Sequence, residues 1–214
     1  MTLQDLGYSE KLEQIRVEKG LESFDVGRVI IEHKDRYMVK NQTGEFEAEL
    51  VGNLRFTAES RYDFPAVGDW VAISEFDVGK VLIHAIFPRQ TIMERKAAGK
   101  AFKKQIIAAN VDIGFIVQAV DRDYNINRLE RYITICNEAH VKPIIVLSKV
   151  DLVNPTEVNE MIAKINQRIP GITVIPVSNQ SSIGFDQLMA TIEPGKTYCL
   201  LGSSGAASKG SSFT

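Results

Sequence analysis

The segment Ser148-Lys149-Val150-Asp151 follows directly on an apolar run, Ile144–Leu147. The carboxylate of Asp151 can accept hydrogen bonds from the N1–H and the exocyclic amine of guanine, donors that adenine does not offer in those places. The alkyl stem of Lys149 can lie along the face of a purine. The segment therefore predicts a loop that reads guanine, with Ser148, Lys149 and Asp151 as contacts. The alternative is a solvated turn that caps the next segment.

A second polar pair follows the next apolar run along the chain. Ser178 and Asn179 come directly after Ile172–Val177. The carboxyl ends of parallel strands meet at one edge of a doubly wound sheet, where ligands bind. We therefore expect this pair beside the first loop, with backbone amides near the guanine carbonyl oxygen. Taken alone, the pair fits an ordinary polar turn equally well.

Gly202-Ser203-Ser204-Gly205 begins like a phosphate-binding loop, in which glycines expose backbone N–H groups, a lysine reaches the outer phosphates and a hydroxyl holds magnesium. The pattern GxxxxGK[ST] then breaks, because Ala207, Ser208 and Lys209 stand where glycine, lysine and the hydroxyl belong. A bulged working loop, a degenerate or flexible chain end, and an artefact of the sequence remain alternatives. The predicted phosphate contacts are Gly202, Ser203, Ser204, Gly205, Lys209 and Ser211.

The order of these loops is unusual. In the common arrangement of a GTP-binding domain, the phosphate loop follows the first strand and the guanine-reading loops come last. Here the guanine-reading segments precede the phosphate-loop segment. This order predicts a circularly permuted GTP-binding domain.

From Val111 onward, apolar runs alternate with amphipathic segments, which predicts an α/β domain whose mostly parallel sheet is covered by helices on both faces. The expected strands are Val111–Val120, Lys142–Leu147, Ile172–Val177 and Thr197–Leu201. The expected helices are Asn127–His140, Pro155–Ile169 and Phe185–Ile192. Asn154 is the expected cap of the middle helix, and Thr197–Leu201 is expected at an unpaired sheet edge.

The preceding part of the chain has the short alternating runs of an all-β module. Five strands in about 65 residues fit a small closed barrel of the oligonucleotide-binding (OB) type, and an SH3-like barrel is the alternative. The expected strands are Phe24–His33, Arg36–Lys40, Phe46–Val51, Asp69–Ser74 and Lys80–Phe87. A loosely attached helix is expected within Leu3–Lys19.

Six basic residues against one acid lie between the two modules, and such an excess can neutralise RNA phosphates. A solubilising linker is the alternative. The predicted RNA contacts are Arg89, Arg95, Lys96, Lys100, Lys103 and Lys104. The aromatic side chains Tyr37, Phe46 and Trp70 are expected in the barrel core, with base stacking as the less favoured alternative.

The chain of 214 residues has a formal net charge of −2, so any contact with nucleic acid must come from a local patch. No apolar run reaches the roughly 18–20 residues of a membrane span, and a soluble, cytoplasmic monomer is expected. Cys136 and Cys199 lack the spacing of a zinc site and are expected as small buried residues. We assign no metal site and no catalytic residue.

The sequence as a whole resembles the RsgA family, the circularly permuted GTPases of the YjeQ and YloQ type that depend on the small ribosomal subunit. The resemblance covers nearly the whole chain, and its specificity lies in the shared order of individually weak motifs. Besides the lysine-aspartate loop, these motifs are Pro65–Val71, Pro88-Arg89, Gln105–Asp112, Asn127–Tyr132 and Leu200–Gly205.

The resemblance implies an N-terminal oligonucleotide-binding barrel, a permuted GTPase domain and a C-terminal zinc domain. It also implies GTP hydrolysis with Mg²⁺ during maturation of the small (30S) subunit, whose rRNA is the implied partner. Ser148 departs from the family's usual asparagine or threonine. The switch regions, the aspartate-x-x-glycine loop and the zinc domain have no counterpart in these 214 residues.

Two hypotheses follow. The first is a ribosome-assembly GTPase, and the alternative is a non-catalytic RNA- or ribosome-binding module with a degenerate nucleotide-binding domain. The expected organisation is an N-terminal extension (1–23), an OB barrel (24–88), a basic linker (89–105) and a partial permuted GTPase domain (106–214).

Overall fold

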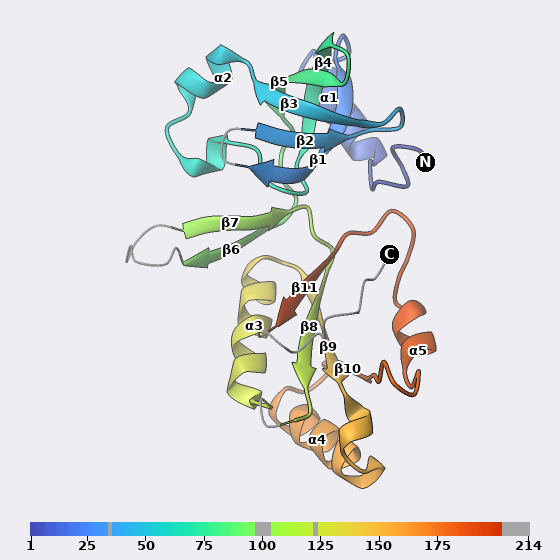
Figure 1. Ribbon diagram of the computed structural model, residues 1–214. Helices are drawn as coiled ribbons and strands as arrows, with labels where there is room; N and C mark the ends of the chain where they lie inside the picture. Colours follow the sequence, from blue (N-terminus) through green and yellow to red (C-terminus); the bar gives the residue numbers. More distant parts are fainter. Residues whose placement is uncertain (34–35, 97–103, 122–123, 203–214) are drawn as a thin grey trace. The chain divides into compact units, whose positions relative to one another are not determined.

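The computed structural model describes residues 1–33, 36–96, 104–121 and 124–202 (Figure 1). The chain divides into two compact units. Of the described residues, the first unit holds those within Met1–Val111 together with Pro194–Thr197, and the second holds those within Asp112–Glu193 together with 198–202.

The first unit is built on a closed five-stranded barrel, as predicted. Its strand order is β1-β2-β3-β5-β4, in which β3 and β5 pair in parallel and the other neighbours pair antiparallel. This order fits the oligonucleotide-binding barrel rather than a simple meander. The strands are β1 (Asp25–His33), β2 (Arg36–Lys40), β3 (Glu45–Leu50), β4 (Trp70–Asp77) and β5 (Lys80–Ile86).

The barrel interior explains the alternation seen in the sequence. Every second residue of a strand faces inward, and the inward side chains form one buried cluster: Val29, Tyr37, Val39, Ala48, Val71, Ile73, Val81 and Ile83. Phe46 packs against this cluster. Tyr37 and Trp70 are each 2% exposed, so the preferred interpretation of them as core residues is confirmed over base stacking.

The N-terminal segment packs firmly on the barrel, which corrects the expectation of a loosely attached helix. Helix α1 spans Glu10–Glu18 and starts late because Ser9 caps it by accepting a hydrogen bond from the Leu12 backbone N–H. Tyr8 and Leu12 are buried in a cluster with Trp70. The Tyr8 and Trp70 rings meet edge to face, with centroids 5.0 Å apart.

Between β3 and β4 the structure has two short elements that the sequence analysis did not predict. Helix α2 spans Gly52–Thr57, and a 3-10 turn, η1, spans Arg61–Asp63. The second is fixed by a capping box, in which Ser60 and Asp63 exchange hydrogen bonds between side chains and backbone. Both elements are too short to show the helical period in sequence.

A two-stranded antiparallel sheet lies where the sequence analysis expected a linker. Strand β6 (Ile92–Lys96) pairs with β7 (Lys104–Ala109). The sequence analysis missed this sheet because charged residues dominate the segment and few of its residues are apolar and buried. Met93 and Ala109 are fully buried, and Ile106 is 8% exposed. The Ala109 backbone N–H donates to the Val67 carbonyl at 2.8 Å, so the hairpin joins the first unit.

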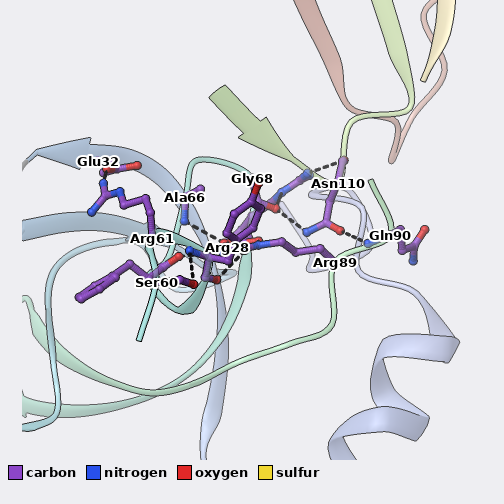
Figure 2. Close-up of polar contacts among 12 residues, drawn as sticks. Arg28, Glu32, Ser60, Arg61, Ala66, Gly68, Arg89, Gln90 and Asn110 are labelled. Atoms are coloured by element: carbon purple, nitrogen blue, oxygen red, sulfur yellow. Dashed lines mark hydrogen bonds and ion pairs between the residues drawn. The ribbon is translucent and has the colours of Figure 1, made fainter. Parts of the chain in front are cut away.

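Arg28 ties together distant segments of the first unit. Its guanidinium donates to the carbonyls of Leu6, Gly68 and Asn110, at 2.5, 3.3 and 3.2 Å, and to the Thr197 hydroxyl at 2.7 Å. Figure 2 shows Arg28 beside Gly68 and Asn110. These bonds explain why the segment ending at Thr197 belongs to the first unit although it follows the second in sequence.

The second unit is built on a parallel sheet, as predicted, and the structure gives its strand order as β10-β9-β8-β11. Its strands are β8 (Ile113–Ala119), β9 (Lys142–Ser148), β10 (Thr173–Pro176) and β11 (Tyr198–Gly202). Among the residues described, β11 pairs only with β8 and so lies at the sheet edge, which confirms the expectation of an edge strand.

Helices cover both faces of this sheet. Phe115 of β8 clusters with Leu188 of helix α5 (Phe185–Met189), whereas helix α3 (Ile126–Glu138) meets the opposite face at Gly114. In Figure 1 the two helices lie on opposite sides of the sheet. Helix α4 (Pro155–Arg168) starts as predicted, with Asn154 as its cap. No helix within the described residues is long and apolar enough to span a membrane.

The two cysteines, which are distant in sequence, meet at Gly114. A Cβ atom on Gly114 would lie 2.8 Å from the Cys136 sulfur and 3.7 Å from the Cys199 sulfur. Burial raises the pKa of Cys136 to about 11 and that of Cys199 to about 12, so both remain thiols near neutral pH. Gly114 thus leaves the space that the Cys136 side chain fills between α3 and the sheet.

We expect Gly114→Ala to destabilise the second unit by about 1–3 kcal/mol, because the added methyl group overlaps the Cys136 sulfur. Urea unfolding followed by the far-ultraviolet circular dichroism of the helices measures the change. Adding Cys136→Ala should recover part of the loss. Gly44→Ala is the control, since a Cβ there meets nothing within 4 Å. Equal stabilities of Gly114→Ala and Gly44→Ala would contradict this packing account.

Candidate nucleotide-binding site

Three neighbouring strands of the second unit deliver polar residues to one edge of the sheet. Strands β8, β9 and β10 run parallel and adjacent, so their carboxyl ends lie together. Asp121 follows β8, Lys149 follows β9 and Ser178 follows β10. This is the edge at which open parallel sheets bind ligands.

The loop after β9 has an unusual backbone at Lys149. Its φ of 62° and ψ of 34° lie in the left-handed region, which costs a residue with a side chain about 1–2 kcal/mol. The conformation is supported by the Val150 backbone N–H, which donates to the Val177 carbonyl at 3.3 Å. Strained residues of this kind cluster at ligand sites, and this one turns the chain so that Asp151 follows at the surface.

Ser178 orients the carboxylate of Asp151. The Ser178 side chain is fully buried, and its hydroxyl oxygen accepts hydrogen bonds from the backbone N–H groups of Gln180 and Ser181, both at 3.2 Å. Its own proton is therefore available to Asp151 Oδ1, 2.5 Å away. Asp151 is exposed, and its Oδ2 has no hydrogen-bond partner among the described residues.

Two further predicted guanine contacts lie at the same edge. Ser148 ends β9, and its carbonyl accepts from the Val120 backbone N–H at 3.1 Å. Asn179 is exposed beside Ser178. The chain then turns tightly at Gly184, where φ is +77° and a Cβ would lie 1.8 Å from the Pro176 carbonyl oxygen, so only glycine fits.

One residue at this edge was missed by the sequence analysis. Asp121 Oδ2 lies 2.9 Å from Lys149 Nζ, and the two side chains are 24% and 31% exposed. The residues are 28 positions apart, and only the adjacency of β8 and β9 brings them together. Asp121 also belongs to no sequence motif or periodic pattern that would have identified it as a site residue.

Of the predicted phosphate contacts, the structure describes only the first. Gly202 ends β11, and its carbonyl accepts a hydrogen bond from the Tyr132 hydroxyl of α3 at 3.1 Å. The others lie outside the described residues: Ser203, Ser204, Gly205, Lys209 and Ser211. Within the described residues, no group of three or more His, Cys, Asp or Glu side chains could hold a metal ion.

The structure corrects the role expected for Arg89. Its side chain is 9% exposed, and its guanidinium is bound to Asp69 and to the carbonyls of Tyr62 and Phe64. Figure 2 shows the place of Arg89 among the neighbouring polar residues of the first unit. A guanidinium held in this way is not available to RNA phosphates, so Arg89 leaves the set of proposed RNA contacts.

The remaining basic candidates lie around the β6–β7 hairpin. The backbone places Arg95 and Lys96 in β6 and Lys104 at the start of β7. Lys100 and Lys103 lie outside the described residues. Three of the basic residues therefore lie in strands, whereas the sequence analysis expected them on a linker.

The sequence model of the RsgA GTPase family matches residues 86–211, which is more than half of the chain. This chain belongs to the RsgA GTPase family. The match includes both segments predicted to read guanine and the start of the predicted phosphate loop, and it confirms the resemblance drawn from the motifs.

Several curated relatives carry the same family name. The small ribosomal subunit biogenesis GTPase RsgA 2 of Lactiplantibacillus plantarum is 37% identical over 84% of this chain and 50% of its own length. RsgA of Opitutus terrae is 35% identical over 96% of this chain and 58% of its own length. The chain thus spans about half to three fifths of these RsgA proteins.

Solved structures agree on the fold. YjeQ from Thermotoga maritima superposes with a TM-score of 0.66 at 19% identity, covering 85% of this chain and 61% of YjeQ. YloQ, described as a circularly permuted GTPase, superposes with a TM-score of 0.63, also at 19% identity and the same coverage. These superpositions confirm the predicted fold, a barrel followed by a permuted α/β domain.

Proposed function

We propose that this chain binds guanine nucleotides as part of a GTPase that acts in the biogenesis of the small ribosomal subunit. The observation that carries the proposal is the Asp151 carboxylate, oriented at one oxygen by Ser178 and open at the other among the described residues. The RsgA relatives, which are named small ribosomal subunit biogenesis GTPases, support the reaction and the partner.

In this proposal each loop residue has a defined task. Asp151 Oδ2 accepts the N1–H of guanine, and the carboxylate also meets the exocyclic amine. Lys149 lays its alkyl stem along the purine face, and the backbone amides around Ser178 and Asn179 face the guanine carbonyl. Adenine is rejected because it would leave the Asp151 carboxylate unpaired beneath the bound base, and an unpaired polar group in an occupied binding site is costly.

The phosphates and Mg²⁺ would be held by the loop that starts at Gly202. Backbone amides of that loop, Lys209 and the Ser211 hydroxyl are the proposed ligands, by resemblance to phosphate-binding loops. Bound Mg²⁺ would neutralise charge on the phosphates during transfer to water. At the described end of the loop, the Tyr132 hydroxyl holds the Gly202 carbonyl and so fixes where the loop leaves β11.

A non-catalytic RNA-binding module is the second candidate, favoured by one observation in the sequence. Ala207 and Ser208 occupy the glycine and lysine positions of the phosphate loop. In either case we propose cytoplasmic action on ribosomal RNA. The proposed RNA contacts are the basic residues around the β6–β7 hairpin: Arg95, Lys96, Lys100, Lys103 and Lys104.

Calorimetric titration of the chain with GDP, GTP and ATP in the presence of Mg²⁺ tests the proposal. We expect GDP to bind at least about 100-fold more tightly than ATP, because only guanine satisfies the Asp151 carboxylate. Equal affinities, or no binding by a protein whose circular dichroism shows it folded, would overturn the proposal. The latter result would leave the RNA-binding module as the function.

A further inference from the structure

Lys149 of the proposed guanine loop is held at its backbone and at the end of its side chain. At the backbone end, the Leu152 N–H donates to the Lys149 carbonyl at 3.0 Å, within a turn that fixes the left-handed conformation. At the far end, Asp121 Oδ2 lies 2.9 Å from Nζ. A free lysine side chain samples many rotamers, and the contact with Asp121 favours those that keep Nζ beside this carboxylate.

Asp121 is itself placed by the sheet. The Val120 backbone N–H donates to the Ser148 carbonyl at 3.1 Å, which joins the end of β8 to the end of β9. The Tyr124 N–H donates to the Asp121 carbonyl at 2.8 Å, which closes a turn directly after the strand. The bond between Val120 and Ser148 therefore joins the residue before Asp121 to the residue before Lys149.

We propose that Asp121 is a positioning residue for nucleotide binding, which holds the end of the Lys149 side chain so that its alkyl stem is placed to cover the purine face. The inference rests on the proposed function, because it needs a purine at this edge. Holding the lysine before the nucleotide arrives removes the ordering cost that binding would otherwise carry. The ion pair thus raises affinity for the nucleotide although Asp121 never touches it.

An opposing effect of Asp121 makes the proposal testable. Its negative charge repels the phosphates of a nucleotide, and salt screens that repulsion. If repulsion dominated, removal of the charge would strengthen binding, most of all at low salt. If positioning dominates, removal of the charge weakens binding and the loss persists at high salt.

The test is a double-mutant cycle on the affinity for GDP, measured by calorimetry at low and high salt. Asp121→Asn keeps the shape of the side chain and removes its charge, and we expect about fivefold weaker binding, as for a partly exposed ion pair. Lys149→Met should also weaken binding. The double variant should bind GDP as Lys149→Met does, because Asp121 acts through Lys149.

Asp77→Asn is the matched control, since Asp77 forms an exposed ion pair with Lys80 at 3.1 Å in the barrel, and GDP affinity should not change. Unchanged or tighter GDP binding by Asp121→Asn would overturn the inference. The inference would also be overturned if Asp121→Asn lowered GDP affinity equally in wild type and in Lys149→Met, because the effect of Asp121 would then not pass through Lys149. Selective GDP binding by the wild-type protein keeps the proposed function, whatever Asp121→Asn does. If the wild-type protein binds no GDP, the proposed function and the inference about Asp121 are both wrong.

Discussion

Replacement of Asp151 by asparagine is expected to weaken GDP binding by about 100-fold or more and to remove the preference for guanine. In the proposed contact the carboxylate accepts two hydrogen bonds from the base, and hydrogen bonds to a charged group contribute roughly 1.5–3 kcal/mol each. Asparagine keeps the size of the side chain and can still accept the Ser178 hydroxyl proton. Its amide group, however, presents a donor where guanine also presents donors.

Calorimetry with GDP, xanthosine diphosphate and ATP separates a change of specificity from a loss of folding. Xanthine carries a carbonyl where guanine carries the exocyclic amine, so the asparagine amide can donate to it and Asp151→Asn should gain affinity for the xanthine nucleotide. Glu160→Gln, an exposed change on α4, is the control. GDP affinity within about threefold of wild type in Asp151→Asn would refute the guanine contact.

The fold was largely predictable because its signals are local. Alternating runs marked all five barrel strands within a few residues, and continuous apolar runs marked the four parallel strands. The start of α4 was also predictable, since Asn154 and Pro155 act within one turn of the helix. The elements missed were short, as α2 and η1 are, or charged, as the β6–β7 hairpin is, which has few buried apolar residues.

The candidate site was predictable only where it lies on consecutive residues. The loop 148–151 was predictable because it directly follows the apolar strand β9, and Ser178 because it follows the next strand, β10. The ion pair between Asp121 and Lys149 depends on which strands become neighbours, which the sequence does not state. Arg89 shows the converse error, because a basic residue counted within a charged run turned out to have its partner, Asp69, 20 residues earlier.

The second large expected effect concerns that buried ion pair. Asp69 is fully buried, and its carboxylate accepts three hydrogen bonds from Arg89, at 2.6–3.0 Å, and one from the Ala66 backbone N–H at 2.8 Å. Asp69→Ala would leave a nearly buried guanidinium without its counter-charge. Breaking a buried pair at one partner costs about 3–5 kcal/mol, so we expect the free energy of unfolding of the first unit to fall by that amount.

Tryptophan fluorescence during urea unfolding measures this change, because Trp70 is the single tryptophan of the chain and lies buried in the first unit. Asp77→Ala, which removes an exposed ion pair, should cost no more than about 1 kcal/mol. Adding Arg89→Met to Asp69→Ala should restore part of the stability, since it removes the uncompensated charge and keeps an apolar side chain. A loss in Asp69→Ala no larger than that of Asp77→Ala would mean that the pair does not hold the barrel to the segment leaving it.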